Sequence, residues 1–558
     1  MRLWCSIPVG VTTPLEKEPL PLVASEEKSR TVTIFLGVVW GIRDMNQQSP
    51  VIGIDLGTTF SVCAVLTPSG DPQTVLTPTG EHNIPSVVAF DRENVLVGLR
   101  AKMMLSRHPD FVIEHAKRYM GERVFPKEID GRYYAPEVIS GLVLARLRSN
   151  LIRRIGSCDR AVVTVPAYFD EVRRKATQDA AYLAGLEVLE LLNEPTAAAI
   201  AFGYHQGFID GEEMLAGGPK YVMVYDLGGG TFDVTLMKID GNDYQVLATD
   251  GDCRLGGIDW DQRLVDLVAE HWIRTADLDP REDSKTLAQL ENVCEKAKQS
   301  LSRRQKAEIS LDTGSGEILS MNVTRAVFEE ETADLVERTR FTMNEVLRAA
   351  GMTWAGVDRV LLTGGSTRMP MIRNMVDRVS GKRADTSIAP DEAVAHGAAL
   401  RAGLLLSERA GVPAKYRIAN VNSHTLGVVG IDQETGRRRV GPIIKRNTTI
   451  PVAKRRTFQT CRHGQRTLQI EIVEGENPNP DACTLIGCCK IRNLPEGLPM
   501  ATPVVVVFRY ATDGRLDVKV RLKELGKEAT ATFLRSSGLS KEDLDTWRHF
   551  ISGLPPAE

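Results

Sequence analysis

Short apolar runs, each ending in an acidic residue or a proline before a turn, recur along the first 400 positions. Such runs predict buried strands that lead into tight loops. Between them lie longer segments with apolar residues at every third or fourth position, which predict helices. The predicted strands cover 51–55, 161–166, 221–226 and 360–363, and the predicted helices cover 173–183, 264–272, 286–301 and 324–350. This alternation of strands and helices is typical of an α/β fold.

The pattern changes after Leu406. The segment 407–419 is polar and is broken by glycine and proline, so it predicts a linker that ends an α/β domain over 51–406. Further strands are predicted beyond it, and the dipeptide Asp513-Gly514 predicts a hairpin turn. We therefore expect a compact all-β domain over 420–534. The strand signals lie at 467–473, 504–510 and 515–521, and a short helix capped by Ser540 is predicted within 535–558.

One motif occurs twice. Asp55-Leu-Gly-Thr-Thr-Phe60 returns 171 positions later as Asp226-Leu-Gly-Gly-Gly-Thr-Phe232, each time at the end of a predicted strand. Glycines allow backbone amides to approach anionic oxygens, so both loops are candidates for holding phosphate between two similar lobes. The candidate residues are Gly57, Thr58 and Thr59 in the first loop and Gly228, Gly229, Gly230 and Thr231 in the second.

Three aspartates lie in or next to the same two motifs. Asp55, Asp226 and Asp233 would repel a triphosphate unless a divalent cation lay between them, and hydrated Mg²⁺ suits such carboxylates. The loop Gly364 to Pro370 follows another strand and is a candidate for the nucleotide base, on which Arg368 could stack. Two helices rich in small residues, around 194–203 and 391–403, would allow the lobes to cross closely; tight core packing explains them equally well.

Composition narrows the class of protein. The chain has 558 residues, and about 150 residues per domain gives roughly three or four domains. A net charge of −3 does not favour nucleic acid or a membrane surface as the main partner, although 411–525 carries 19 Lys and Arg against 10 Asp and Glu. Nine cysteines, an odd and small number, fit a reducing compartment, and we expect the cytoplasm.

The first 50 residues show no clear period. Their longest apolar run, 31–42, is too short to span a bilayer. We expect this stretch to be an extension that is disordered or not part of the true protein, with Met45 as the start.

In order along the chain, these motifs resemble those of the heat-shock protein 70 family of chaperones. The resemblance covers 51–539. It is carried by Ile-Asp-Leu-Gly-Thr-Thr-Phe-Ser (54–61), Val-Pro-Ala-Tyr-Phe-Asp (165–170), Asn-Glu-Pro-Thr-Ala-Ala-Ala (193–199), Asp-Leu-Gly-Gly-Gly-Thr-Phe-Asp (226–233), Glu-Lys-Ala-Lys-Gln-Ser-Leu-Ser (295–302), the Gly364 loop, Arg-Asn-Thr-Thr-Ile-Pro (446–451) and Val-Glu-Gly-Glu (473–476).

The resemblance implies an actin-like ATPase domain of two duplicated lobes, followed by a β-sandwich that binds peptides. It implies ATP or ADP with Mg²⁺ as ligands, and unfolded polypeptide, a J-domain co-chaperone and a nucleotide exchange factor as partners. By resemblance, Lys117 is the catalytic lysine that orients the attacking water, with Glu194 and Thr231 as its partners. The residues implied to hold the nucleotide further include Phe60, Glu295, Lys298, Ser302, Gly364, Gly365, Ser366, Arg368 and Asp391.

In the β-domain the resemblance implies a pocket for an extended apolar peptide. Its lining would be Val428, Ile431, Phe458, Leu468 and Ile470, with Cys461 arching over the peptide. Each of these residues could equally be plain sandwich core.

The chain departs from the family pattern at three places. Only 540–558 remain for the helical lid, so we expect the lid to be missing and bound peptides to leave quickly. The linker carries Tyr416-Arg-Ile-Ala-Asn-Val421 in place of a leucine-rich run, which predicts weaker docking on the ATPase domain. Glu190 stands where the family commonly has an arginine, which predicts an altered response to a J-domain partner.

The sequence therefore predicts an ATP-hydrolysing chaperone that binds exposed apolar segments of unfolded proteins. The alternatives are a regulatory nucleotide-binding adaptor with a weakened chaperone cycle, a small-molecule kinase of the same fold, and a filament-forming protein of the same superfamily. Release of phosphate without a second substrate would separate the chaperone from the kinase.

Overall fold

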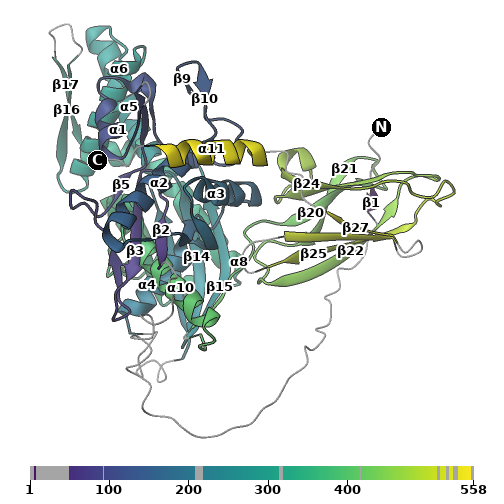
Figure 1. Ribbon diagram of the computed structural model, residues 1–558. Helices are drawn as coiled ribbons and strands as arrows, with labels where there is room; N and C mark the ends of the chain where they lie inside the picture. The colour runs from purple at the N-terminus through teal and green to yellow at the C-terminus, as the bar shows by residue number, and fades with distance from the viewer. Residues whose placement is uncertain are drawn as a thin grey trace, which may run out of the picture. The chain divides into compact units, whose positions relative to one another are not determined.

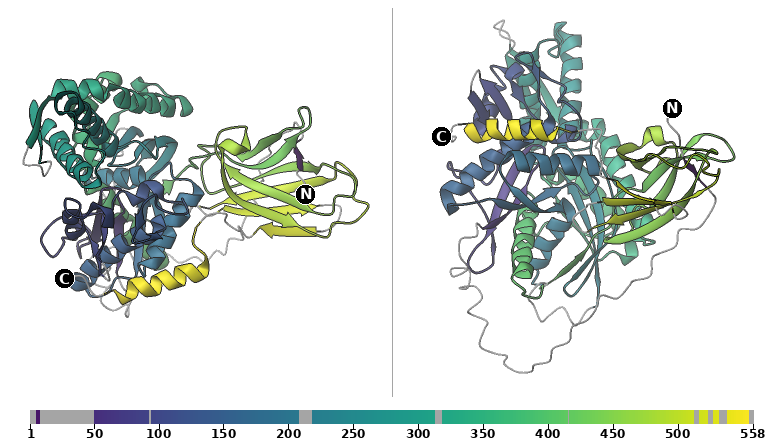
Figure 2. Two further views of the ribbon diagram at one scale, coloured as in Figure 1. Left: turned by 90° about the horizontal axis from the view of Figure 1, so that it is seen from above. Right: turned by 45° about the vertical axis from the view of Figure 1, so that its right-hand side comes forward.

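The computed structural model of the protein describes residues 5–7, 50–91, 94–207, 218–312, 318–414, 416–511, 516–522, 527–531 and 538–554. These residues divide into two compact units. The larger unit contains the described parts of 50–66, 72–419 and 538–554, and the smaller unit contains 5–7, 67–71 and the described part of 420–536. Figures 1 and 2 show both units, and each is described by itself below.

The larger unit is built on two mixed sheets (Figure 1). The first has the order β12-β11-β2-β3-β4, with β5 also on β3, and the second has the order β18-β13-β14-β15-β19. The strands of the first sheet are β2 (Val51–Asp55), β3 (Phe60–Leu66), β4 (Pro72–Thr74), β5 (Ile84–Pro85), β11 (Arg160–Val165) and β12 (Glu187–Asn193). Those of the second are β13 (Lys220–Leu227), β14 (Phe232–Asp240), β15 (Asp243–Asp252), β18 (Arg359–Thr363) and β19 (Arg417–Ala419).

The two sheets repeat one arrangement. In each, a central strand forms an antiparallel hairpin with the next strand and pairs in parallel with a later one: β2 with β3 and β11, and β13 with β14 and β18. The duplicated glycine loops lie at the hairpin turns, between β2 and β3 and between β13 and β14. The predicted α/β fold with two similar lobes is therefore confirmed.

Helices and smaller strand groups complete this unit. The helices are α1 (Leu99–Met104), α2 (Pro136–Ile155), α3 (Glu171–Leu183), α4 (Glu194–His205), α5 (Gly257–Ala276), α6 (Ser284–Leu301), α7 (Arg325–Glu331), α8 (Ala333–Ala349), α9 (Pro370–Ser380), α10 (Ala393–Arg409) and α11 (Lys541–Gly553). The remaining strands are β6 (Val88–Asp91), β7 (Asn94–Val97), β8 (Val112–Ile113), β9 (Glu128–Ile129), β10 (Arg132–Tyr133), β16 (Lys306–Asp312) and β17 (Ile318–Thr324).

The prediction of a single helix over 324–350 is wrong, because the structure has two helices there. They separate at Thr332, whose hydroxyl donates to the Phe328 carbonyl oxygen at 2.7 Å. A side chain that bonds to the preceding turn offers the backbone an alternative to regular helix, which periodicity alone does not reveal.

The helices rich in small residues cross as closely as predicted. A Cβ atom on Gly397 of α10 would lie 1.8 Å from the carbonyl oxygen of Ala197 in α4, so only glycine fits there. Helix α10 also packs on the first sheet, where Gly53 of β2 lies against it, and α4 packs against β13 and β14 of the second sheet. The crossing therefore joins the two lobes.

Helix α11 begins after Ser540, as predicted, and its first turn is closed by a capping box with Asp543. It packs on α2 and α3 within the larger unit (Figure 1). Its residues Trp547, Arg548 and Ile551 face this unit: the Trp547 ring lies 5.7 Å from that of Tyr134, and the Arg548 guanidinium lies 4.3 Å from the Tyr182 ring. The expected absence of a lid stays a prediction.

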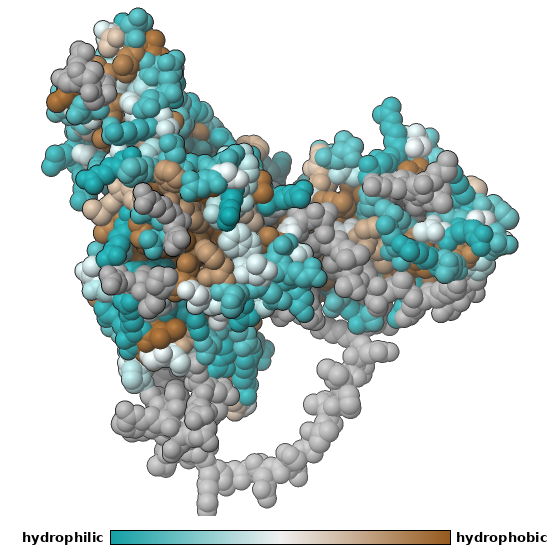
Figure 3. All heavy atoms as spheres, turned by 45° about the horizontal axis from the view of Figure 1, so that its top comes forward, coloured by the Kyte–Doolittle hydropathy of each residue, from teal (hydrophilic) through white to brown (hydrophobic). Residues whose placement is uncertain are grey.

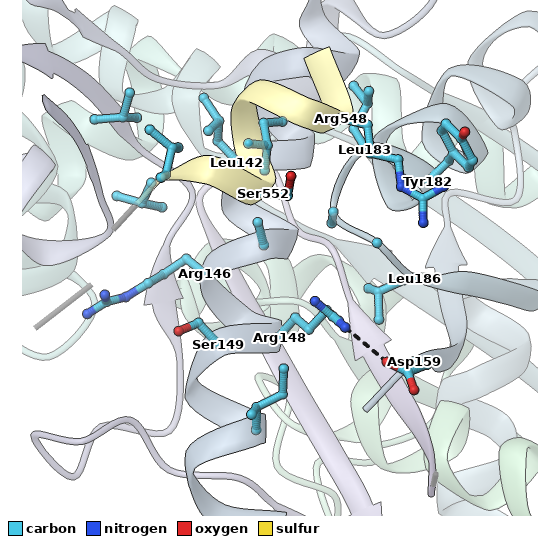
Figure 4. A pocket seen from close by; sticks show the side chains of 18 of the residues that line it. Leu142, Arg146, Arg148, Ser149, Asp159, Tyr182, Leu183, Leu186, Arg548 and Ser552 are labelled. Carbon is cyan, nitrogen blue, oxygen red and sulfur yellow. Dashed lines mark hydrogen bonds and ion pairs between the residues drawn. The ribbon is translucent and has the colours of Figure 1, made fainter. Parts of the chain in front are cut away.

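A hollow of about 980 Å³ lies between α2, the end of α3 and α11 (Figure 4). Apolar side chains such as Leu142 and Leu186 line it together with Arg146, Arg148 and Arg548. Arg148 is held by Asp159 at 2.9 Å. None of the predicted nucleotide or peptide residues lines this hollow.

The smaller unit is a β-domain, as predicted. Its sheet order is β24-β23-β20-β1-β22-β25-β26-β27, with β21 also on β20. The strands are β1 (Cys5–Ile7), β20 (Leu426–Asp432), β21 (Arg438–Ile444), β22 (Val452–Thr460), β23 (Leu468–Glu474), β24 (Thr484–Ile491), β25 (Pro503–Tyr510), β26 (Leu516–Leu522) and β27 (Lys527–Ala531). The hairpin predicted at Asp513-Gly514 joins the paired strands β25 and β26, although both turn residues lie outside the described residues.

The first 50 residues were expected to be disordered or not part of the true protein. In the structure, Cys5–Ile7 form strand β1 in the sheet of the β-domain. Residues 8–49, with the predicted start at Met45, lie outside the described part of the chain.

The surface of the described residues is largely hydrophilic on the face drawn in Figure 3, with apolar side chains gathered in patches. Within the described ranges, no helix has the length and apolar character needed to cross a membrane.

Candidate functional site

The two glycine loops face each other across the larger unit. A Cβ atom on Gly229 would lie 1.9 Å from the Thr59 hydroxyl oxygen, and one on Gly230 would lie 2.5 Å from the Thr58 methyl carbon. These close approaches explain why the second loop is built from glycine. The loops of the two lobes thus meet as the duplicated motif predicted, with Thr58 and Thr231 buried between them.

Lys117 and Glu194 form a buried ion pair beside these loops. Lys117 lies in a short 3-10 helix (Ala116–Tyr119) and Glu194 begins α4, and their Nζ and Oε1 atoms are 2.6 Å apart. Only 5% of the Lys117 side chain and 9% of the Glu194 side chain are exposed. Burial opposes the charge on Lys117, but Glu194 and Asp55 outweigh it and raise the pKa of the lysine. The ammonium group therefore stays charged.

Three aspartates surround this pair. Burial, followed by the charge of Glu194, raises the pKa of Asp55 to about 7 and that of Asp233 to about 8, and the same causes raise the pKa of Asp226. One lysine thus faces four buried or half-buried carboxyl groups, which carry more negative charge than it can balance. A divalent cation would supply the missing positive charge, so the residues fit the predicted Mg²⁺.

Two of these aspartates also accept hydrogen bonds from neighbouring groups. Within the part of the chain that the structure describes, no three His, Cys, Asp or Glu side chains are placed to hold a metal ion. Asp55 accepts a hydrogen bond from the Thr164 hydroxyl at 3.3 Å, and Asp233 accepts one from the Tyr168 backbone N–H at 2.9 Å.

The candidate base site forms beside the second loop. Gly364 follows β18 with φ of 83°, a conformation that favours glycine. The Ser366 hydroxyl donates to the Gly228 carbonyl oxygen at 2.8 Å, which ties this turn to the phosphate loop. Lys298 donates to the Gly257 carbonyl oxygen at 2.8 Å, and Ser302 donates to the Lys298 carbonyl oxygen at 3.3 Å.

Arg368 and Asp391 meet in two parallel bonds of 2.7 Å. This bidentate pair fixes the guanidinium plane at the edge of the Gly364 turn, where a Cβ atom on Gly365 would lie 3.5 Å from the Asp391 carboxylate. Arg368 is about half exposed, so one face of it remains available to a flat ring.

Other ion pairs here were not predicted from the sequence. Arg118 reaches from the first lobe to the second, where its Nε donates to the Gly230 carbonyl oxygen at 3.0 Å and its two terminal nitrogens donate to Asp259. Lys102 donates to Glu295 at 2.8 Å and lies 5.6 Å from the centre of the Phe60 ring. Both pairs join residues far apart in sequence, so no local pattern could reveal them.

The sequence matches one family model and several known proteins. The family model described as "Hsp70 protein" matches residues 51–130 and 124–549. Chaperone protein DnaK of Thermosipho melanesiensis is 37% identical over 502 residues, which cover 89% of this chain and 82% of that protein. The proteins of the same name from Thermotoga neapolitana (37% identity; 88% and 82% covered) and Thermosipho africanus (36%; 90% and 82%) are similar.

The chain belongs to the Hsp70 family. This membership confirms the resemblance seen in the sequence and places the chain among ATP-dependent molecular chaperones, with an actin-like ATPase domain and a β-sandwich.

The linker of this Hsp70 protein contacts the ATPase domain, and the expectation of weaker docking stays a prediction. Residues 417–419 form β19, which pairs in parallel with β15. Tyr416 is only 4% exposed, and its ring lies 5.8 Å from that of Tyr244. An aromatic side chain of the linker is thus buried against the ATPase domain, and α10 extends to Arg409, into the predicted linker.

Glu190 is held within the ATPase domain. Its carboxylate accepts two bonds from Arg401 of α10, at 2.9 Å and 2.7 Å, and 13% of its side chain is exposed. The glutamate therefore has a structural partner of opposite charge, and the altered response to a J-domain stays a prediction.

The predicted peptide residues of the β-domain fall into two groups. Val428, Phe458, Leu468 and Ile470 are buried, at 0 to 2% exposure, as sandwich core would also be. Ile431 and Cys461 are half-buried; Ile431 pairs with Ser6 of β1, and Cys461 directly follows Thr460, the partner of Cys5.

Proposed function

We propose that this Hsp70 protein hydrolyses ATP between its two glycine loops and uses the β-domain to hold extended apolar segments of unfolded proteins. The observation that carries the first half is the buried Lys117–Glu194 pair, which lies where the loops of both lobes meet. A charged lysine in a buried site stabilises a developing negative charge far more strongly than a lysine in water does.

Different residues would bind the phosphates and position the attacking water. Backbone amides of Gly57 and of the second loop approach the phosphates, and the Thr59 and Thr231 hydroxyls add donors. Glu194 holds Lys117 so that its ammonium group points at the terminal phosphoryl group and at the attacking water. The water oxygen then bonds to phosphorus as the bond to ADP breaks, and the water's proton leaves with the phosphate product.

Mg²⁺, when bound, would neutralise phosphate charge. Asp55, Asp226 and Asp233 would hold it through water molecules, which agrees with their raised pKa values. Glu295, Lys298, Ser302 and Arg368 would hold the adenosine. A cytoplasmic location is consistent with the eight cysteine side chains that the structure describes, all of them free thiols.

The β-domain contributes a slot between β20 and β22 that accepts one extended strand. Backbone pairing at the slot gives affinity for any extended peptide, and apolar side chains beside it select apolar segments.

The experiment that tests both halves is peptide binding with and without nucleotide. A fluorescein-labelled, leucine-rich peptide should bind the full chain, and Mg-ATP should accelerate its release, followed by fluorescence anisotropy. Phosphate should appear without any second substrate. A chain that releases no phosphate, or needs a small-molecule acceptor to do so, would contradict the ATPase assignment.

A further inference from the structure

The strand β1 lies inside the β-domain although it comes from the beginning of the sequence. Cys5, Ser6 and Ile7 pair in parallel with Gly430, Ile431 and Asp432 of β20. On its other side, β1 pairs antiparallel with β22, Cys5 opposite Thr460 and Ser6 opposite Gln459. Three residues thus form a strand with partners on both sides.

The other described strands of the β-domain form two hydrogen-bonded groups, and β1 is the strand that pairs with both of them. One group is β21, β20, β23 and β24, and the other is β22, β25, β26 and β27. Neighbouring strands of a sheet lie about 4.8 Å apart, so β20 and β22 face each other across roughly 10 Å. This is the width of one strand, and β1 fills it.

The slot coincides with the predicted peptide site. Ile431 is the partner of Ser6, and Cys461 follows Thr460, the partner of Cys5. Phe458 comes directly before Gln459, the other partner in β22. The strand β1 therefore occupies the place that an extended client peptide would take.

The chemistry of the segment matches that of such a client. From Leu3 to Leu15 the sequence has no charged residue, and it begins Leu-Trp-Cys-Ser-Ile-Pro-Val. Apolar, uncharged and extended segments are what a slot of this kind selects.

We propose that residues 5–7 act as an internal client: they fill the peptide slot of the β-domain and must leave before a peptide from another protein can bind. Being part of the same chain, the segment competes at an effective concentration that can reach the order of millimolar. A client must therefore bind more tightly, or the segment must first be released. This inference rests on the proposed peptide-binding function.

The test uses the full chain and a variant in which residues 3–9 are replaced by glycine and serine. The probes are a fluorescein-labelled heptapeptide with the sequence of residues 3–9 and a labelled leucine-rich peptide. We expect the replaced chain to bind both probes at least tenfold more tightly than the intact chain. Each unlabelled peptide should displace the other, because both would share one slot.

Two point variants locate the effect. Ile7→Asp should open the slot as the replacement does, whereas Ile34→Asp, the same change elsewhere in the first 50 residues, should leave peptide affinity at the level of the intact chain. Ile431→Asp, placed in the replaced chain, should weaken both probes, because it alters the slot itself.

The outcomes separate the inference from the function on which it rests. If intact and replaced chains bind the leucine-rich probe equally, or if the replaced chain binds that probe but not the heptapeptide, residues 5–7 are not an internal client. If neither chain binds any apolar peptide, the proposed function of the β-domain fails as well.

Discussion

Arg118 gives the sharpest quantitative prediction, because it bridges the two lobes next to Lys117. Replacing it by alanine removes the 3.0 Å bond to the Gly230 carbonyl oxygen and the bonds to Asp259. Hydrogen bonds to charged groups contribute about 1.5–3 kcal/mol each. The Arg118 and Asp259 side chains are 15% and 28% exposed, so solvent screens part of this and we expect a net loss of about 2 kcal/mol.

The bridge joins the two lobes between which we propose that the nucleotide binds, so its loss should make it easier for the lobes to separate and release ADP. Since 1.4 kcal/mol is a factor of ten, Arg118→Ala should release ADP about 30-fold faster than the parent chain. Stopped-flow release of a fluorescent ADP analogue measures this rate directly. Asp259 would still cap α5 through its 2.7 Å bond from the Gly256 N–H, so the helix should remain intact.

A matched control is Arg340→Ala, which removes an exposed pair with Glu337 on one face of α8. Such surface pairs contribute at most about 1 kcal/mol, and this one spans no lobe boundary, so ADP release should stay within twofold of the parent rate. An Arg118→Ala rate within threefold of the parent would refute the role assigned to the bridge.

Three further predictions concern other parts of the larger unit. Lys117→Ala should lower single-turnover phosphate release by about 10²–10³ while ATP still binds, and an unchanged rate would remove the lysine from the mechanism. Glu137 is 1% exposed, and burial raises its pKa to about 7 from 4.5, so its ionisation destabilises the fold increasingly between pH 4.5 and 7. Glu137→Gln should therefore raise the free energy of unfolding by up to about 3 kcal/mol at pH 8 and much less at pH 5, measured by denaturant unfolding; an equal gain at both pH values would contradict this cause. Tyr416→Ala should loosen β19 by about 3 kcal/mol, seen as faster hydrogen exchange of the amides of 417–419, and unchanged exchange would show that the ring does not hold the linker.

The strands and both glycine loops could be predicted because their signals are local. A buried strand needs an apolar run, and a segment that lies very close to another one needs glycine, as at Gly229 in the second loop and Gly397 in α10. The helix break at Thr332 and the docking of Tyr416 could not be predicted, since both depend on contacts made after folding.

The site residues divide in the same way. Asp55 and Asp226 were identified from a repeated motif, but Lys117 lies in a sequence typical of an exposed surface, and only the family resemblance indicated its role. Its 5% exposure follows from the way α4 brings Glu194 against it. The position of β1 depends on a pairing across more than 400 residues, which no local pattern encodes.

The proposed activity requires one nucleotide to bind with Mg²⁺ between the two glycine loops. Isothermal titration calorimetry of the purified full chain with ATP, in millimolar magnesium and then in a chelator, tests it most directly. We expect one binding event per chain, with an affinity that falls sharply when magnesium is removed. Absence of heat beyond dilution in magnesium would contradict it.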